Sequence, residues 1–303
     1  MDKYIISIVG PTGIGKTSLS IKLATYFKTE IISADSRQFY KEIPIGTAAP
    51  SNEEQKAIIH HFIHNKSILD KYSVGDFERE AIECITTIHK HNPIVVLVGG
   101  SGLYVQAVLE GLDDFPEVSA NIRTQLNTEF KTNGIQGLQK ELKTLDPIAY
   151  EAIALDNPHR VIRALEICRG TGKAYSGFLN KEKKKRNFKT IQIGLTAERS
   201  LVYGRINRRV DLMIAKGLVD EVKSVLEYKH LNALNTVGYK EVFRYLEGHC
   251  SLDSATEEIK KNSRRFAKRQ FTWFKRQDKT KWYDHRAPIE EILAYINKML
   301  SCT

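Results

Sequence analysis

The segment GPTGIGKTS at residues 10–18 constrains the fold of this chain more than any other stretch. Its spacing, G-x-x-x-x-G-K-[ST], is typical of a loop whose backbone N–H groups close around phosphate oxygens, with Lys16 adding positive charge and Thr17 offering a hydroxyl to Mg²⁺. An apolar run precedes it, and Leu19, Leu23 and Tyr26 follow near helical spacing. We therefore predict a strand, a loop and a helix whose N-terminus favours an anion, rather than a chance glycine-rich turn. The predicted phosphate-binding residues are Gly10, Pro11, Thr12, Gly13, Ile14, Gly15, Lys16 and Thr17.

Strand-like and helical patterns alternate through the first third of the chain. Apolar runs occur at residues 5–9, 30–34 and 93–100, and between them Phe77, Ala81, Ile85 and Ile88 share one helical face. This alternation predicts an α/β fold, a P-loop NTPase-like parallel sheet with helices on both faces. From residue 115 the periodicity is helical only, until a strand-like run returns at 188–197. We predict a core of residues 1–114 and 188–303, interrupted by an all-helical insertion at 115–187.

Two further loops follow predicted strands, at the sheet edge where open α/β sheets bind ligands. Asp35 and Ser36 come after the second strand, and Gly99, Gly100 and Ser101 after the third. Asp35 is ionised at neutral pH and able to accept a proton, although a turn aspartate fits its position equally well. For Ser101, a helix cap is slightly favoured. The third strand ends in glycines rather than an acid that would hold Mg²⁺, which disfavours a motor or a helicase.

The chain carries a net charge of +10, and most of the excess lies near its C-terminus. Residues 260–283 contain ten Lys and Arg residues against the single acid Asp278. On a helix, seven of these cations fall within an arc of about 140°. They are Lys261, Arg264, Arg265, Lys268, Arg269, Lys275 and Arg276. Phe266, Ala267, Phe271, Trp273 and Phe274 occupy the other side, which we expect to pack on the core, so the acid-free basic side predicts a nucleic-acid surface.

Other features are weaker guides. Arg160 and Arg163 lie one helical turn apart in the insertion, where a solvated face is at least as good an explanation. The histidines of IIHHFIHN, at residues 58–65, lack a partner cluster, so a metal site is disfavoured. No run approaches the ~20 apolar residues of a membrane span, and the phosphate loop begins too early for a signal peptide. We expect a cytoplasmic monomer that does not contact membranes.

Nine motifs, in order over nearly the whole chain, resemble those of bacterial tRNA dimethylallyltransferases. They are GPTGIGKT, ISADSRQFYKEIPIGTAAP, HHFI, LVGGSGLYVQAV, DPIAYEAI, NPHRVIRALEI, RINRRVDLMIAKGLVDEV, VGYKE and RRFAKRQFTWFKR. The resemblance implies a phosphate-loop core with a helical insertion that binds the tRNA anticodon arm. It also implies that the loop holds dimethylallyl diphosphate rather than ATP, with Mg²⁺ as cofactor. The family moves the dimethylallyl group to N6 of the adenosine 3′-adjacent to the anticodon, a base that must first leave the stack.

The resemblance assigns roles to individual residues. Lys16 and the loop amides bind the diphosphate, Thr17 binds Mg²⁺, and Asp35 is the general base. Arg205 or Arg209 supplies an arginine to the leaving diphosphate. The residues implied in catalysis are Asp35, Lys16, Ser101 and Arg209. Those implied in tRNA binding are Asp35, Ser36, Arg37, Gln38, Ser101, Arg123, His159, Arg160, Val161, Ile162, Arg163, Arg265, Lys268 and Arg269.

Two positions depart from the family pattern: Ser101 stands where many relatives have Thr, and Ala49 where many have Lys. The first change keeps the hydroxyl, and the second puts any contact through that lysine in doubt. Two other function classes stay open on residues alone. A small-molecule kinase would share the loop and Asp35 but has little use for a one-sided basic helix, whereas a nucleic-acid-binding ATPase should carry an acid after the third strand.

Overall fold

The computed structural model describes residues 2–179 and 183–301, which form two compact units. The first comprises Met1–Glu110 and Lys185–Thr303, and the second is Gly111–Lys184, rather than the predicted 115–187. None of the helices in the described ranges combines the length and apolar character needed to cross a bilayer.

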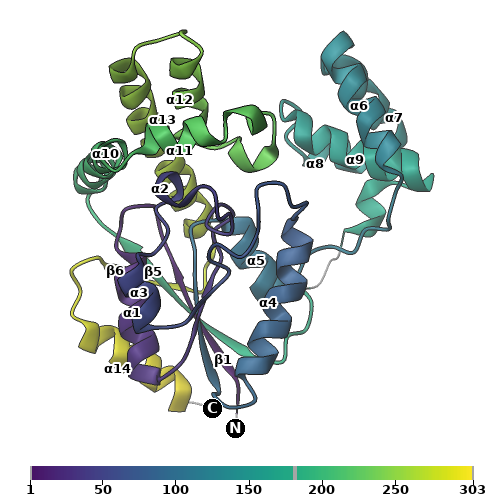
Figure 1. The fold of residues 1–303 in the computed structure, drawn as a ribbon. Helices are drawn as coiled ribbons and strands as arrows, with labels where there is room; N and C mark the ends of the chain where they lie inside the picture. Colours follow the sequence, from purple (N-terminus) through teal and green to yellow (C-terminus); the bar gives the residue numbers. More distant parts are fainter. Residues whose placement is uncertain (1, 180–182, 302–303) are drawn as a thin grey trace. The chain divides into compact units, whose positions relative to one another are not determined.

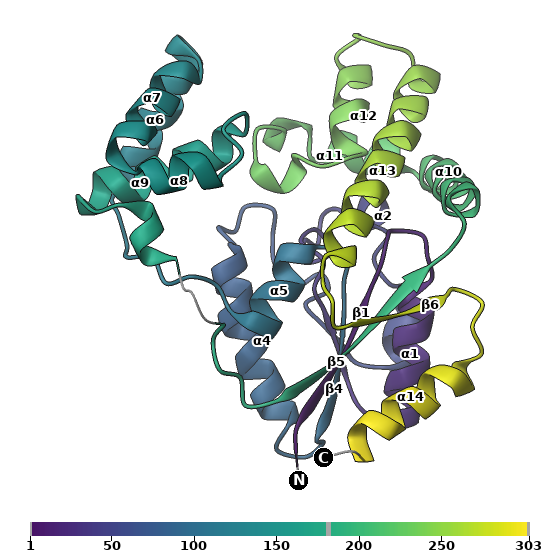
Figure 2. The same cartoon turned by 180° about the vertical axis from the view of Figure 1, so that it is seen from behind.

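The core of the first unit is a six-stranded parallel sheet in the order β3-β2-β4-β1-β5-β6, so the predicted α/β class is confirmed. The strands are β1 (Tyr4–Val9), β2 (Ile31–Ser33), β3 (His60–His61), β4 (Ile94–Val98), β5 (Lys189–Thr196) and β6 (Thr280–Asp284). Successive side chains of β1 point to opposite faces: Ile6 packs with α1 and α14, and Ile5 packs with α4 and α5. Figures 1 and 2 show these helix pairs on the two faces of the sheet.

Helices of the first unit occupy both faces and the carboxyl edge of the sheet. Those that cover the faces are α1 (Lys16–Phe27), α4 (Val74–Ile88), α5 (Gly102–Glu110) and α14 (Ile289–Ser301). Above the carboxyl edge lie α10 (Arg199–Ala215), α11 (Leu218–Ser224), α12 (Tyr239–Leu246) and α13 (Leu252–Lys275). The short helices α2 (Pro44–Thr47) and α3 (Asn52–Ala57) follow β2. A separate apolar cluster, which includes Ile43, Leu218 and Tyr239, joins helices α10, α11, α12 and α13 to the segment after β2. This cluster covers the carboxyl ends of the strands.

The second unit is all helical, with its own apolar core. Its helices are α6 (Ala120–Asn133), α7 (Gln136–Leu145), α8 (Pro147–Ala152) and α9 (Pro158–Thr171). Asp146, which is buried, caps α8 by accepting from the Ala149 amide at 2.9 Å and also accepts from the Ser176 amide at 2.6 Å. These charge-assisted bonds to backbone amides lower the pKa of Asp146 although burial acts against them.

Candidate active site

The loops after β1, β2 and β4 meet at the carboxyl edge of the sheet, as the sequence predicted. A Cβ atom on Gly99 would lie 2.3 Å from the Ala34 carbonyl oxygen, so only glycine allows the second and third loops to approach this closely. The Ser101 hydroxyl accepts from the Ser36 amide at 3.0 Å. Ser101 therefore begins α5 through its backbone carbonyl, while its side chain fastens the loop that carries Asp35.

The phosphate loop has the backbone that its glycines require. Gly10 has φ of 144° and lies where a Cβ would be 2.7 Å from the Leu195 carbonyl oxygen. Gly15, with φ of 111°, precedes α1 and has no side chain to cap the first-turn amides of that helix. These amides and the helix dipole make the loop an anion site.

Lys16 is held inside the phosphate loop. Its ammonium donates to the carbonyl oxygens of Gly10 at 3.0 Å and Pro11 at 2.9 Å. Burial lowers the pKa of Lys16 to about 8; the Asp35 carboxylate opposes this shift and the Arg209 guanidinium adds to it. The ammonium is therefore a charge that an incoming anion would stabilise.

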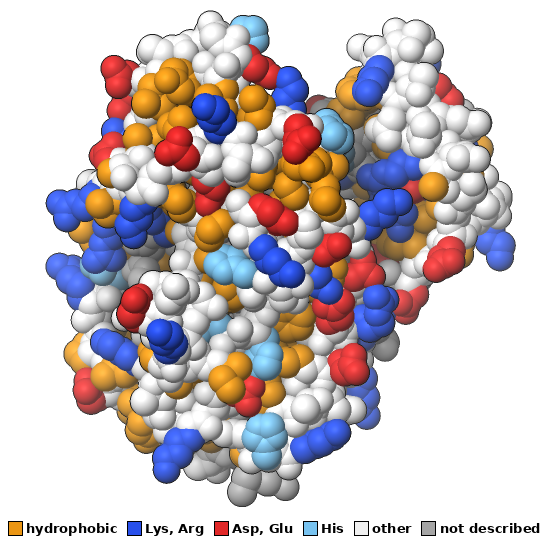
Figure 3. Space-filling view, viewed as in Figure 1, with side chains coloured by type: hydrophobic (Ala, Val, Ile, Leu, Met, Phe, Trp, Pro, Cys, Tyr) orange, Lys and Arg blue, Asp and Glu red, His pale blue; other side chains and the backbone are white. Residues whose placement is uncertain are grey.

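Two arginines of α10 reach the same loop. Arg209 donates to the Thr12 hydroxyl, and Arg205 donates to the Ile14 carbonyl oxygen at 3.3 Å. Burial lowers the pKa of Arg209, and the Asp35 carboxylate opposes that shift, but a guanidinium stays charged at neutral pH. In Figure 3, Lys and Arg side chains gather at the left of the first unit, where α10 lies.

Two adjoining cavities surround these groups, with volumes of about 530 and 420 Å³. Both are lined by Thr12, Lys16, Asp35, Thr47, Gly100 and Arg209. The smaller cavity continues along the phosphate loop to Thr17 and Arg205. The larger one has an apolar wall, made by Ile206, Val210, Met213, Ile259 and Phe266. The arrangement can hold an anion in one cavity and an apolar or aromatic group in the other, with Asp35 and Lys16 bordering both.

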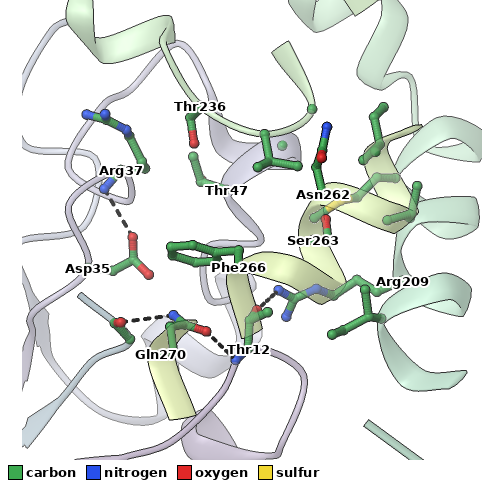
Figure 4. A pocket seen from close by; sticks show the side chains of 18 of the residues that line it. Thr12, Asp35, Arg37, Thr47, Arg209, Thr236, Asn262, Ser263, Phe266 and Gln270 are labelled. Carbon is green, nitrogen blue, oxygen red and sulfur yellow. Dashed lines mark hydrogen bonds between the residues drawn. The ribbon is translucent and has the colours of Figure 1, made fainter. Parts of the chain in front are cut away.

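Asp35 lies at the junction of the two cavities. Its Oδ1 accepts from the Arg37 amide at 3.0 Å, the bond of an aspartate turn, and Figure 4 shows the carboxylate among the residues that line the larger cavity. The turn role and an acid–base role are therefore compatible. Gln38, which lines the smaller cavity, donates to the carbonyl oxygens of Thr47 at 3.4 Å and Ala48 at 3.2 Å, so its amide supports the segment after β2.

Sequence reasoning missed the residues that hold the cavity walls. Glu221 accepts from the amides of Ile45 at 2.7 Å and Gly46 at 2.8 Å, and from the Tyr239 hydroxyl at 2.6 Å. Burial and the neighbouring Glu221 raise the pKa of Tyr239, which keeps this hydroxyl protonated. These hydrogen bonds of Glu221 hold α2 in place, and Thr47 of α2 lines both cavities. The residues that make them lie in the motifs IPIGTAAP, GLVDEV and VGYKE, and periodicity alone does not indicate that these motifs meet.

Helix α13, which contains the predicted basic stretch, is longer than predicted, and its charge is less uniformly positive. It begins at Leu252, so it also carries acids: Lys261 pairs with Glu258 at 2.8 Å, which contradicts an acid-free helix. The side chain of Arg264 donates to Asn207 of α10 at 2.8 Å. Phe266 and Trp273, predicted to pack on the core, are 38% and 36% exposed. The exposed basic end nevertheless forms an open groove, lined by Arg265, Lys268, Arg269, Thr272, Trp273 and Arg276.

In the second unit, the predicted RNA-binding segment divides between surface and core. Val161 and Ile162 are 0% and 3% exposed, so their side chains belong to the core of the second unit, which contradicts RNA contact through these side chains. His159 and Arg160 are exposed. Arg123 and Arg163 both donate to the same Glu166 oxygen, at 3.1 and 2.8 Å, which holds the two guanidinium groups together.

The histidine cluster has ordinary structural contacts. His61 lies 2.6 Å from a Glu30 carboxylate oxygen, and His60 Nδ1 lies 2.8 Å from the Ile58 carbonyl oxygen. Within residues 2–179 and 183–301, no three His, Cys, Asp or Glu side chains are placed to hold a metal ion.

A family model and individual relatives point to the same protein family. A family model described as IPP transferase matches residues 38–277. A tRNA dimethylallyltransferase of Christiangramia forsetii is 54% identical over 301 residues, which cover 99% of this chain and 100% of the relative. One from Flavobacterium johnsoniae is 53% identical and covers 97% of each chain.

Solved structures agree with these sequence relatives. The tRNA isopentenylpyrophosphate transferase of Bacillus halodurans has a TM-score of 0.71 at 38% identity, covering 99% of this chain and 96% of that one. A eukaryotic dimethylallyltransferase acting on tRNA has a TM-score of 0.86 at 27% identity, covering 99% and 80%.

Proposed function

The chain belongs to the IPP transferase family, and we propose that it transfers the dimethylallyl group of dimethylallyl diphosphate to N6 of the adenosine 3′-adjacent to the anticodon of tRNA, releasing diphosphate. The observation that carries this proposal is the pair of adjoining cavities: an anion site and a partly apolar space share Lys16, Asp35 and Arg209. A donor with a charged end and an apolar end fits across that junction.

The phosphate loop, Lys16, Arg205 and Arg209 bind the diphosphate. As the bond between the prenyl carbon and the diphosphate oxygen breaks, negative charge grows on the leaving group, and these fixed cations and amides stabilise it. Because Arg205 and Arg209 both line the smaller cavity, we assign both to the diphosphate.

Asp35 accepts the proton that N6 loses as the new carbon–nitrogen bond forms. A neutral exocyclic amine is a weak nucleophile, and a carboxylate at the junction of the cavities improves it. Ser101 supports this role by holding the Ser36 amide, next to Asp35, at 3.0 Å.

The residues present fit a Mg²⁺ ion that is shared with the donor. Mg²⁺ prefers oxygen ligands and usually binds one or two protein groups together with phosphate oxygens. Thr17 lines the smaller cavity, so its hydroxyl and the diphosphate oxygens would hold the ion. When bound, the ion neutralises charge on the leaving diphosphate.

The RNA partner binds through two sets of exposed or partly exposed cations, one in each unit. On α13 these are Arg265, Lys268 and Arg269, and in the second unit they are Arg123, Arg160 and Arg163. Ser36, Arg37 and His159 complete the proposed contacts. Phe266 and Trp273 lie beside the α13 cations, a mixture that suits unpaired nucleotides because bases stack on aromatic rings.

Mass analysis of nucleosides tests the proposal directly. The protein is incubated with dimethylallyl diphosphate, Mg²⁺ and an anticodon stem-loop RNA, and the digested adenosine should carry one added prenyl group, with one diphosphate released per transfer. A stem-loop with guanosine at the acceptor position is the matched control. Phosphate release from ATP without RNA modification would instead support a kinase or an ATPase and overturn the proposal.

A further inference from the structure

Gln270 is a buried polar side chain on the packed side of α13. It is 6% exposed, and the buried residues Ala267 and Phe274 lie on the same side of the helix. A buried amide is costly unless its polar atoms are hydrogen-bonded. Both are: the Oε1 atom accepts from the Thr12 amide at 2.8 Å, and the Nε2 atom donates to the Gly100 carbonyl oxygen at 2.9 Å (Figure 4).

These two bonds join different loops of the site. Thr12 lies in the phosphate loop, and its hydroxyl accepts from Arg209. Gly100 directly precedes Ser101, whose hydroxyl holds the amide next to Asp35. Gln270 is therefore a bridge between the anion-binding half of the site and the half that carries the acid.

The fit around this bridge is close. A Cβ atom on Gly100 would lie 2.4 Å from Gln270 Nε2, so the third loop must be glycine at this point for the amide to reach its carbonyl oxygen. An apolar side chain of similar length, such as methionine, would fill the space but would leave the Thr12 N–H and the Gly100 carbonyl without these partners.

We propose that Gln270 is a positioning residue, which fixes the phosphate loop against the β4–α5 loop and so sets the distance between the donor's diphosphate and Asp35. The inference rests on the proposed transfer reaction and adds a residue of the larger cavity's lining that acts through the two loops it joins. Displacement reactions are sensitive to such placement, and a misplacement of about 1 Å can cost ~10²-fold in rate. Loss of Gln270 should therefore lower kcat by about 10- to 100-fold, while the donor KM and the RNA Kd change by less than about threefold, because each half-site keeps its own contacts.

The variant Gln270→Glu distinguishes a hydrogen-bonding role of residue 270 from a role in packing alone. An ionised carboxylate still accepts from the Thr12 amide but repels the Gly100 carbonyl oxygen, whereas the protonated acid makes both hydrogen bonds. Burial next to a carbonyl oxygen raises the pKa of the new carboxyl group, whereas the Lys16 ammonium beside Gly100 and the Arg209 guanidinium on Thr12 act against this rise. The kcat of Gln270→Glu divided by that of the wild type should therefore rise as the pH is lowered from about 8 to about 5.5.

Two other variants complete the comparison. Gln270→Met makes neither bond at any pH, so its ratio to the wild type should stay low and flat. Gln139→Glu is the matched control, because Gln139 also donates to a backbone carbonyl oxygen, that of Leu155 at 2.9 Å, but lies in the second unit. Its ratio should stay near one throughout.

Hydrogen exchange without substrates gives an answer that does not depend on the reaction. Peptides covering residues 10–17 and 99–103 should exchange at least about threefold faster in Gln270→Met than in the wild type, since the bond from the Thr12 amide is lost. Unchanged exchange in both peptides would overturn the bridge. Faster exchange with kcat within about threefold of wild type, or with a flat Gln270→Glu ratio, would overturn its role in positioning. A wild-type protein that transfers no prenyl group would refute the proposed function, while the exchange data still decide whether Gln270 holds the loops.

Discussion

Raising the pH should weaken donor binding through Lys16, because its ammonium lies inside the phosphate loop. Burial lowers the pKa of this group from 10.5 to about 8 in the protein without ligand. A bound diphosphate favours the charged lysine, so the pKa rises on binding. Above pH 8 the donor must therefore bind together with a proton. Well below pH 8 the lysine is already charged, so Lys16 does not make donor binding depend on pH.

The size of the effect follows from the two-state titration of one group. With a pKa of about 8, roughly nine-tenths of Lys16 is charged at pH 7 and roughly one-tenth at pH 9, so the donor Kd should rise about tenfold between them. A diphosphate monoester completes its own ionisation lower on the pH scale, since the last phosphate pKa is about 6. The slope in this range therefore belongs to the protein.

Calorimetric titration with dimethylallyl diphosphate in the absence of RNA measures this slope. Repeating the titration in buffers of different ionisation enthalpy reports the proton uptake, which should approach one per donor at about pH 9. Lys16→Arg is the matched control, because a guanidinium stays charged across this range and its Kd should be nearly constant with pH. A wild-type Kd that does not change between pH 7 and 9, or an equal slope in Lys16→Arg, would refute the assignment of this pKa to the donor site.

Three variants test the other proposed roles. Asp35→Asn should keep donor and RNA affinity but lower transfer by about 10²-fold or more, and near wild-type turnover would exclude it as the base. Thr17→Ala should raise the Mg²⁺ concentration needed for half-maximal rate, so an unchanged Mg²⁺ titration would remove the hydroxyl from the ion's ligands. Replacing Arg265 and Lys268 together by Gln should flatten the log–log salt dependence of tRNA binding by roughly 1 to 2 units, whereas superimposable lines would remove this part of α13 from the RNA interface.

Local sequence patterns were sufficient to predict most strands of the sheet and the helices that pack on it. The four residues predicted to share the inner face of α4 are its buried residues, because an amphipathic period has one way to pack against a sheet. Tyr26 of α1 was misplaced: it is 53% exposed, whereas Ala24 is buried. The strands β3 and β6 were missed because the first has two residues and the second, TKWYD, is a partly exposed edge strand without an apolar run.

The candidate site was predictable where one loop carries both the backbone geometry and the chemistry. Gly10, Lys16 and Thr17 belong to such a loop, whose spacing alone indicates a bound phosphate. Glu221 and Gln270 do not, because each acts by joining segments that are more than 150 residues apart in the chain, as in the bond from the Ile45 amide to Glu221. Periodicity describes neighbours along one helix, so it gives no information on such pairs.

Helix α13 shows what a helical-wheel projection of the sequence can predict and what it cannot. The projection separates cations from apolar residues, but it treats the apolar side as one surface. In the structure that side has a buried centre, with Ala267, Gln270 and Phe274, and a flank, with Phe266 and Trp273. At 100° per residue, Phe266 and Trp273 lie about 80° to 100° from Phe274 and next to Arg269, so the geometry for an exposed aromatic and basic stripe was already in the sequence. What the sequence lacked was the position of the neighbouring loops. They place the Thr12 amide and the Gly100 carbonyl at the centre of the packed side, where a glutamine can bond to both and an apolar residue to neither.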